Sequence, residues 1–198
     1  GRGGCFLRGP PARTLEVTRL DHAAARRLGW DSCGLDAVFS YASTLSTDTL
    51  LIVSGNEIVG SFGNLTSPYR THLMRKAFLS AFIGLHVGSA KNQIRLNATL
   101  LELAIDDEPG PLTALQKQTT VKNLLNRKSG INHRAAADGG LIADNVRRLG
   151  GRENISGTIW AYNNWNYNAL TTIFEPRTGL AVAEAFNTGI AQPAQMKD

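Results

Sequence analysis

Long hydrophobic runs are absent from this chain of 198 residues, and cysteine is scarce. No apolar run approaches the roughly 18 residues of a membrane-spanning helix, so we expect no transmembrane segment. The two cysteines, Cys5 and Cys33, form neither a metal-binding pattern nor a disulfide framework, and their spacing leaves a single bridge open. The four histidines also lack ligand spacing. We therefore expect no metal and no cofactor.

A strong excess of one charge is also missing. The net charge is only +5, and the Lys and Arg residues are scattered without a stripe of interleaved aromatics. A clustered basic patch, rather than a small net charge, marks a nucleic-acid interface, so nucleic acid is not an expected partner. The remaining composition, 42% hydrophobic and 19% charged, is typical of a soluble globular protein.

The start of the chain differs from the rest in composition. Residues 1–11 are rich in Gly, Pro and Arg and lack the apolar segment of a secretion signal. We predict a partly disordered N-terminal extension over residues 1–29, in which residues 18–28 could form a short helix ended by Gly29. Residues 30–198 contain no internal repeat and no low-complexity linker, which indicates one domain.

The first part of this domain has the pattern of a helix followed by a β-hairpin. Between residues 34 and 45 the apolar residues fall on one helical face, with Asp31 or Ser32 as the N-cap. Residues 49–53 and 57–62 are two β-rich runs separated by a short turn. The pattern therefore predicts an antiparallel hairpin.

The clearest amphipathic helix begins near Met74. Apolar residues recur at helical spacing, and we expect this set to face the core: Met74, Phe78, Phe82 and Leu85. Lys76 lies in the first turn, where a cation meets the positive end of the helix dipole. A lysine at this place needs either an exposed side chain or a chemical role.

Three later segments complete the pattern. The acidic residues 106–108 predict an exposed loop, because they offer too few oxygen ligands for a calcium or magnesium site. Thr120 is the expected N-cap of a short helix over residues 121–126. Residues 159–174 run from an apolar stretch through an Asn-rich stretch into a helix, which predicts Tyr162-Asn163-Asn164 at a strand-to-helix corner.

A lysine on the first turn of a buried helix, followed later by Tyr-x-Asn at such a corner, is an arrangement in which lysine and tyrosine activate a serine. The chain resembles the beta-lactamase-related serine hydrolases in four segments and in their order along the chain: residues 74–84, 96–100, 120–130 and 162–170. That family includes class C beta-lactamases, penicillin-binding peptidases and related esterases. The resemblance runs from Trp30 to the C-terminus.

The resemblance implies an α/β fold of the α+β type, beta-lactamase/transpeptidase-like, with an antiparallel sheet and helices. It also implies that Lys76 and Tyr162 manage the protons of acyl transfer and that Asn164 orients the substrate amide. The implied partner is a small-molecule ester, amide or peptide. The family implies a periplasmic or secreted protein, although this sequence shows no signal peptide.

The sequence departs from the family pattern at the nucleophile. In Ser-x-x-Lys the serine precedes the lysine by three positions, and Leu73 stands there. Ser80 lies one turn on the other side of the lysine, and Thr71 is out of helical register, so neither replaces the serine convincingly. No Lys-Thr-Gly or His-x-Gly motif follows Tyr162, so we expect the C-terminal strands of the fold to be missing.

These departures predict little or no hydrolase activity. Two alternatives stay open: a non-catalytic pseudoenzyme that binds a peptide or acyl ligand, and an active esterase or amidase in which Leu73 is a sequence error. Without its C-terminal partner strands, the hairpin would expose an unpaired sheet edge and apolar surface. We therefore predict marginal stability or self-association through that edge.

Overall fold

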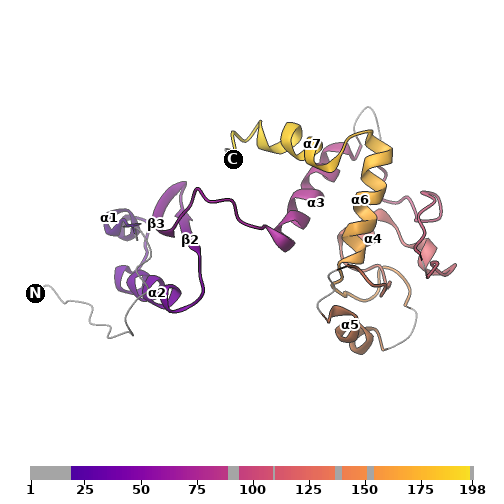
Figure 1. Ribbon diagram of the computed structural model, residues 1–198, viewed down its shortest axis with the longest axis horizontal. Coiled ribbons are helices and arrows are strands. Elements are labelled where there is room, and N and C mark those ends of the chain that lie inside the picture. Colours follow the sequence, from indigo (N-terminus) through magenta and orange to yellow (C-terminus); the bar gives the residue numbers. More distant parts are fainter. Residues whose placement is uncertain (1–18, 89–93, 109, 137–139, 151–153, 197–198) are drawn as a thin grey trace, which may run out of the picture. The chain divides into compact units, whose positions relative to one another are not determined.

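The computed structural model describes residues 19–88, 94–108, 110–136, 140–150 and 154–196. Its contacts divide the chain into two compact units, one up to Tyr69 and one from Arg70 onwards. Figure 1 shows both units and labels α1 to α7, β2 and β3. Helices combined with a small antiparallel sheet form the mixed α and β fold that the sequence predicts.

The first unit is a three-stranded sheet with two helices. Its elements are β1 (Arg19–Leu20), α1 (His22–Arg27), α2 (Ser32–Thr44), β2 (Thr49–Ser54) and β3 (Glu57–Gly63). Strand β3 lies in the middle of the sheet and pairs antiparallel with both neighbours. Asp31 caps α2 as predicted, because its carboxylate accepts a hydrogen bond from the backbone N–H of Gly34.

The predicted hairpin is confirmed, and its turn explains the register. Gly55 and Asn56 both have left-handed backbone angles, with φ of 55° and 61°, as the favoured two-residue hairpin turn requires. Strands β2 and β3 pair antiparallel along their length, with an irregularity between Ile52 and Val53. Strand β2 lies at the edge of the described sheet.

A small apolar core holds the first unit together. Ala25 of α1, Leu35 of α2 and Val59 of β3 are buried against one another. Helix α1 therefore packs onto the sheet, and the domain boundary predicted between residues 29 and 30 stays a prediction. Other apolar side chains of this sheet are about half exposed: Leu51 (46%), Val53 (55%) and Ile58 (53%).

The second unit is helical. Its elements are a 3-10 turn (His72–Met74), α3 (Arg75–His86), a second 3-10 turn (Gln116–Gln118), α4 (Val121–Leu125), α5 (Leu141–Leu149), α6 (Trp165–Thr178), α7 (Val182–Phe186) and a π-helical turn (Asn187–Ala191). Thr120 caps α4 as predicted, because its hydroxyl accepts a hydrogen bond from the backbone N–H of Asn123.

Helices α3 and α6 pack in the core of this unit. The rings of Phe82 and Phe174 meet edge to face, with centroids 4.9 Å apart. Leu124 of α4 and Leu170 of α6 are fully buried beside them in the same cluster. Gly179, with φ of 71°, ends α6 in the left-handed conformation that favours glycine.

The buried face of α3 differs from the predicted one. Met74 and Leu85 are 66% and 55% exposed, whereas Lys76, Leu79, Phe82 and Ile83 are buried. The helix begins at Arg75, after the 3-10 turn, and its buried stripe starts at the lysine. Phe82 is buried and Phe78 packs against the core, as predicted, so the prediction is wrong for Met74 and Leu85. The apolar pattern could not place Lys76 on the buried face, because it counts only apolar residues.

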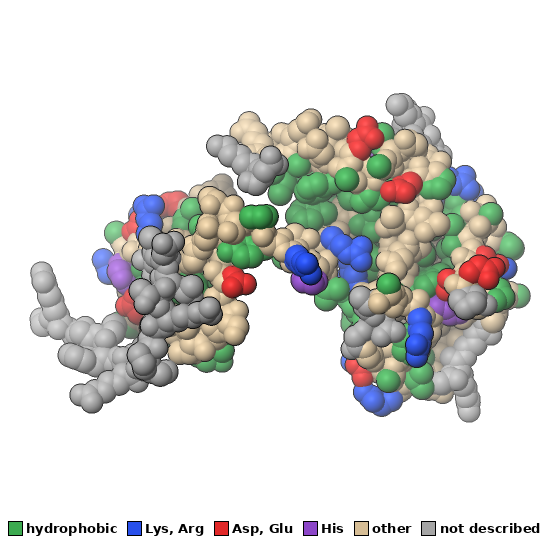
Figure 2. Space-filling view, in the orientation of Figure 1, with side chains coloured by type: hydrophobic (Ala, Val, Ile, Leu, Met, Phe, Trp, Pro, Cys, Tyr) green, Lys and Arg blue, Asp and Glu red, His purple; other side chains and the backbone are tan. Residues whose placement is uncertain are grey.

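Surface properties of the described residues bear on partners. On the face shown in Figure 2, Lys and Arg side chains are spread over the surface rather than gathered into one stripe. Within the described ranges, no helix is long and apolar enough to cross a membrane. In the same ranges, His, Cys, Asp and Glu side chains form no group of three or more that could hold a metal ion.

Candidate active site

The site forms around Lys76, in the first turn of α3. Its side chain is only 2% exposed, although its position at a helix start is unfavourable for a cation. The Nζ atom donates hydrogen bonds to the hydroxyl of Tyr162 and to Oδ1 of Asn164, both at 2.5 Å. The structure therefore brings together the three residues that the sequence singled out.

Tyr162 and Asn164 lie just before α6, on a segment held by three others. The backbone N–H of Ala161 donates to the carbonyl of Arg127 at 2.9 Å. The Asn145 amide, from α5, donates to the carbonyl of Tyr162 at 2.8 Å, and the Asn163 amide donates to the carbonyl of Ile131 at 2.6 Å. These bonds go to separate segments, so residues 159–163 form no strand, and the predicted strand-to-helix corner is wrong in that respect.

A buried polar network supports the start of α6. The Ser129 hydroxyl donates to Oδ1 of Asn166 at 2.8 Å and accepts the backbone N–H of Ile131 at 3.1 Å. Oδ1 of Asn163 accepts the backbone N–H of Asn166 at 2.8 Å, which satisfies an N–H group in the first turn of α6. These bonds offset part of the cost of burying polar groups, and Nδ2 of Asn166 has no hydrogen-bond partner among the described residues.

Sequence reasoning missed several of these supports. The sequence pattern assigned no role to Asn163, Ser129 or Asn166 and predicted no helix at α5, which carries Asn145. The available signal was the density of Asn between residues 163 and 168. Asn residues this close to a helix start often bond to backbone groups.

A comparison with protein-family models matched residues 74–198, and the matching family is described as Beta-lactamase. The chain belongs to the Beta-lactamase family. The match covers more than half of the chain and contains Lys76, Tyr162 and Asn164. A search of curated proteins gave no match.

Burial is the main cause of the pKa shifts of Lys76 and Tyr162 in this Beta-lactamase-family site. Burial, followed by the charges of Arg75 and Arg127, lowers the pKa of Lys76 from 10.5 to about 8. Burial also raises the pKa of Tyr162 above its ordinary value of 10. At neutral pH the lysine is therefore mostly an ammonium and the phenol is neutral, so Lys76 is the donor and Tyr162 the acceptor in their hydrogen bond.

Aromatic rings surround the two cations of the site. The Lys76 Nζ atom lies 4.0 Å from the ring centroid of Tyr162 and 4.8 Å from that of Tyr167. The Arg127 guanidinium lies 4.9 Å from the Tyr162 ring, and its Nε donates to the Tyr167 hydroxyl at 3.3 Å. Cations at these distances are attracted by the ring faces, which offsets part of the cost of burial.

Leu73 occupies the 3-10 turn directly before α3 and is 55% exposed. It lies one residue before the range that the family model matches, and it offers hydrocarbon where the resemblance predicts a hydroxyl. Ser80 and Thr71 are both exposed, whereas Lys76 is buried and bonds to Tyr162 and Asn164. None of Leu73, Ser80 and Thr71 is a hydrogen-bond partner of Lys76 among the described residues.

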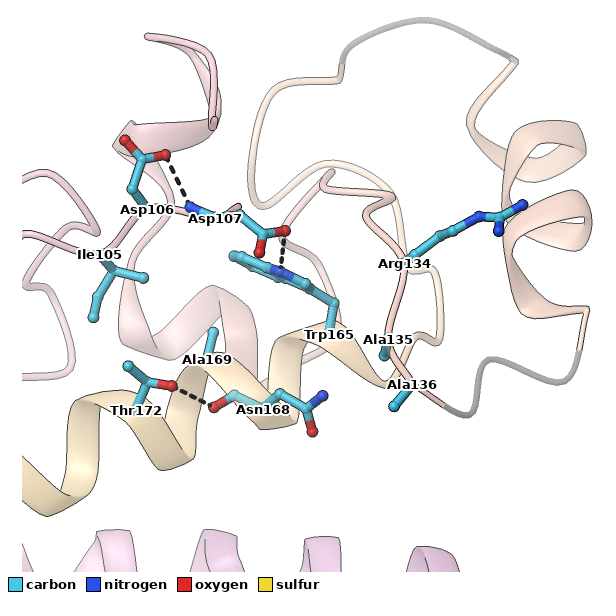
Figure 3. Close-up of a pocket in the computed structure, with 10 residues that line it drawn as sticks. All are labelled: Ile105, Asp106, Asp107, Arg134, Ala135, Ala136, Trp165, Asn168, Ala169 and Thr172. Carbon is cyan, nitrogen blue, oxygen red and sulfur yellow. Dashed lines mark hydrogen bonds between the residues drawn. The ribbon is translucent and has the colours of Figure 1, made fainter. Parts of the chain in front are cut away.

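A separate cleft of about 230 Å³ lies along another face of α6 (Figure 3). Trp165 lines it, and its indole N–H donates to Oδ2 of Asp107 at 2.8 Å. The same oxygen lies 2.8 Å from Nδ1 of His133. Asp106 and Glu108 are exposed as predicted, but Asp107 is half-buried and tied to α6. None of Lys76, Tyr162 and Asn164 lines this cleft.

Proposed function

We propose that this chain is a serine-hydrolase-type domain of the Beta-lactamase family that does not form an acyl-enzyme. The observation that supports this most directly is Leu73 in the turn before α3, three positions before Lys76. A leucine side chain has no oxygen that could attack a carbonyl carbon. The expected family reaction, hydrolysis of an ester, amide or beta-lactam through a covalent intermediate, therefore lacks its first step.

The rest of the site would suit that first step. A hydroxyl nucleophile needs a base within hydrogen-bond reach, and an amine with a pKa of about 8 can accept its proton. Tyr162, at 2.5 Å from Lys76, could relay a proton toward a leaving group. In subtilisin, removal of the nucleophilic serine alone costs a factor of about 10⁶ in rate, which sets the scale of the expected defect.

A second candidate function is binding without turnover. It is favoured by the hydrogen bonds that hold Lys76, Tyr162 and Asn164 in place while Leu73 occupies the nucleophile position. In this reading the site binds a small ester, amide or peptide ligand through groups that would otherwise perform catalysis. Binding of this kind needs no nucleophile.

The test compares the unaltered chain with Leu73→Ser, and uses Leu73→Ala as the matched control. Each protein is incubated with a fluorescent penicillin and with a chromogenic ester, and intact mass is measured alongside product release. We expect neither adduct nor turnover from the unaltered chain or from Leu73→Ala. Leu73→Ser should gain an adduct of the mass of the acyl group, because it restores a hydroxyl beside Lys76.

Turnover by the unaltered chain that is lost in Lys76→Met would contradict the proposal, because it would show chemistry at this site without a serine. Saturable penicillin binding that unlabelled penicillin displaces, without adduct or product, would favour the second candidate. Circular dichroism of each variant checks that the fold is unchanged.

A further inference from the structure

Three Asn-x-Ser/Thr triplets of the chain take no part in the site around Lys76. They begin at Asn64, Asn97 and Asn154. This triplet is the acceptor motif for N-linked oligosaccharides, which are attached through the side-chain nitrogen of the asparagine. Attachment to a folded protein therefore needs an exposed triplet whose asparagine Nδ2 atom is not already engaged as a hydrogen-bond donor. The three triplets differ in both respects.

The triplet at Asn64 meets both conditions. It directly follows β3, and residues 64–71 form neither helix nor strand. Asn64, Leu65 and Thr66 are all exposed. The Oδ1 atom of Asn64 accepts the backbone N–H of Thr66 at 3.0 Å and the Thr66 hydroxyl at 2.8 Å. Within the described ranges these bonds engage the amide oxygen only and Nδ2 has no acceptor, so the nitrogen stays available to an enzyme.

The triplet at Asn154 has its nitrogen engaged. Its Nδ2 atom donates to the backbone carbonyl of Leu149 at 2.9 Å, and Asn154 itself is half-buried. Ser156, the third residue of this triplet, is also half-buried, and its hydroxyl accepts the amide of Asn123 at 2.8 Å. Modification here would break bonds at both ends of the triplet and leave partly buried polar groups without partners.

Asn97 is exposed, but its triplet is fixed into the backbone of the second unit. Ala98 is 1% exposed, and its carbonyl accepts the backbone N–H of Val121 at 3.1 Å. The backbone N–H and the hydroxyl of Thr99 both donate to Oε2 of Glu102, at 2.7 and 3.1 Å. An enzyme that recognises the Thr99 hydroxyl has to displace this carboxylate and open a buried segment, which costs free energy.

We propose that Asn64 is the acceptor of an N-linked oligosaccharide in the folded chain, and that Asn97 and Asn154 stay unmodified. The donor is an oligosaccharide bonded through C1 to a lipid pyrophosphate. Nδ2 of Asn64 forms a bond to C1 while the bond between C1 and the pyrophosphate oxygen breaks. The lipid pyrophosphate leaves with the electron pair, and one Nδ2 proton passes to a base of the transferring enzyme. The inference goes beyond the proposed function and does not depend on it.

The first experiment incubates the folded whole chain with a purified oligosaccharyltransferase and its lipid-linked oligosaccharide donor. Three synthetic peptides, each containing one triplet, serve as unfolded references. Mass spectrometry of proteolytic fragments gives the rate at each asparagine of the chain, and this rate is divided by the rate of the matching peptide. We expect the normalised rate at Asn64 to exceed those at Asn97 and Asn154 at least about tenfold, because the latter two need local opening of the fold.

The second experiment uses variants of the exposed triplet. Asn64→Gln keeps an amide but removes the motif, and Thr66→Ala removes the hydroxyl, so both should abolish modification of the folded chain. Thr66→Ser is the matched control, because it keeps the hydroxyl and should still be modified. All three changes lie at exposed positions, and circular dichroism of each protein checks that the fold is unchanged.

An unmodified Asn64 in the folded chain overturns the inference, whether or not its peptide is modified. Equal normalised rates at the three asparagines, or modification that persists in Asn64→Gln, overturn it as well. The comparison of the chain with the peptides needs no variant, so it stands even where a variant fails to fold. Neither result bears on the acylation test of Leu73→Ser, because the triplet contains none of Lys76, Tyr162 and Asn164.

Discussion

Replacing Lys76 by methionine should change how the stability of the second unit depends on pH. The pKa of the lysine falls from 10.5 to about 8 on folding, and each pKa unit corresponds to about 1.4 kcal/mol. The charged side chain therefore costs the folded state about 3 kcal/mol wherever both states hold the proton, which is below about pH 8. Lys76 is almost fully buried, so solvent screens its charge little.

The sign follows from the protons bound by each state. Between pH 8 and pH 10.5 the unfolded chain keeps the Lys76 proton while the folded chain loses it, so the free energy of unfolding rises with pH. We expect a gain of about 2 to 3 kcal/mol between about pH 7 and pH 10 in the unaltered chain. Above pH 10 the ionisation of Tyr162 lowers the free energy of unfolding as the pH rises, because burial raises the pKa of this group in the folded state. The pH series should therefore end at pH 10.

The assay is urea unfolding at a series of pH values, followed by the fluorescence of Trp160 and Trp165 in a Trp30→Phe background, since Trp30 lies in the first unit. Lys76→Met removes both the cost of the buried charge and the hydrogen bonds to Tyr162 and Asn164, so the two proteins are compared by how their stability changes with pH. Relative to the variant, the unaltered chain should gain about 2 to 3 kcal/mol between about pH 7 and pH 10. A difference between the two proteins that stays flat from neutral pH to pH 10 would refute the reasoning.

Two further predictions concern the backbone and the sheet. Gly130→Ala should destabilise the second unit by more than about 1 kcal/mol, because Gly130 has φ of 74° and an added Cβ would lie 2.4 Å from the backbone oxygen of Asn154. Urea unfolding measures the loss, and an unchanged midpoint would contradict the prediction. Val53→Lys, at an exposed position on edge strand β2, should reduce self-association measured by light scattering. If the unaltered chain is itself monomeric in this assay, the predicted association is wrong.

Local signals in the sequence predicted the elements that depend on neighbours along the chain. Asp31 and Thr120 cap their helices as expected, because N-cap chemistry involves only residues two or three positions apart. The hairpin followed from β-rich runs around Gly55 and Asn56, whose left-handed angles define the turn. Predictions of N-caps and of a two-residue turn need no knowledge of the rest of the fold.

Features set by contacts between distant segments were harder to predict. The buried face of α3 starts at Lys76, whose burial is compensated by residues far along the chain, namely Tyr162, Asn164 and Tyr167. Asn145 is buried for a similar reason, because its amide bonds to the carbonyl of Tyr162. A polar side chain at a buried position cannot be recognised from helical periodicity, which counts only apolar residues.

The first turn of α6 joins two parts of the second unit through neighbouring residues. Asn164 bonds to Lys76 of α3, and Trp165 bonds to Asp107 in the loop that lines the cleft. A single peptide bond therefore lies between the two anchorages. The loop that lines the cleft and the helix that carries Lys76 are thus both anchored at the start of α6, by side chains of adjacent residues.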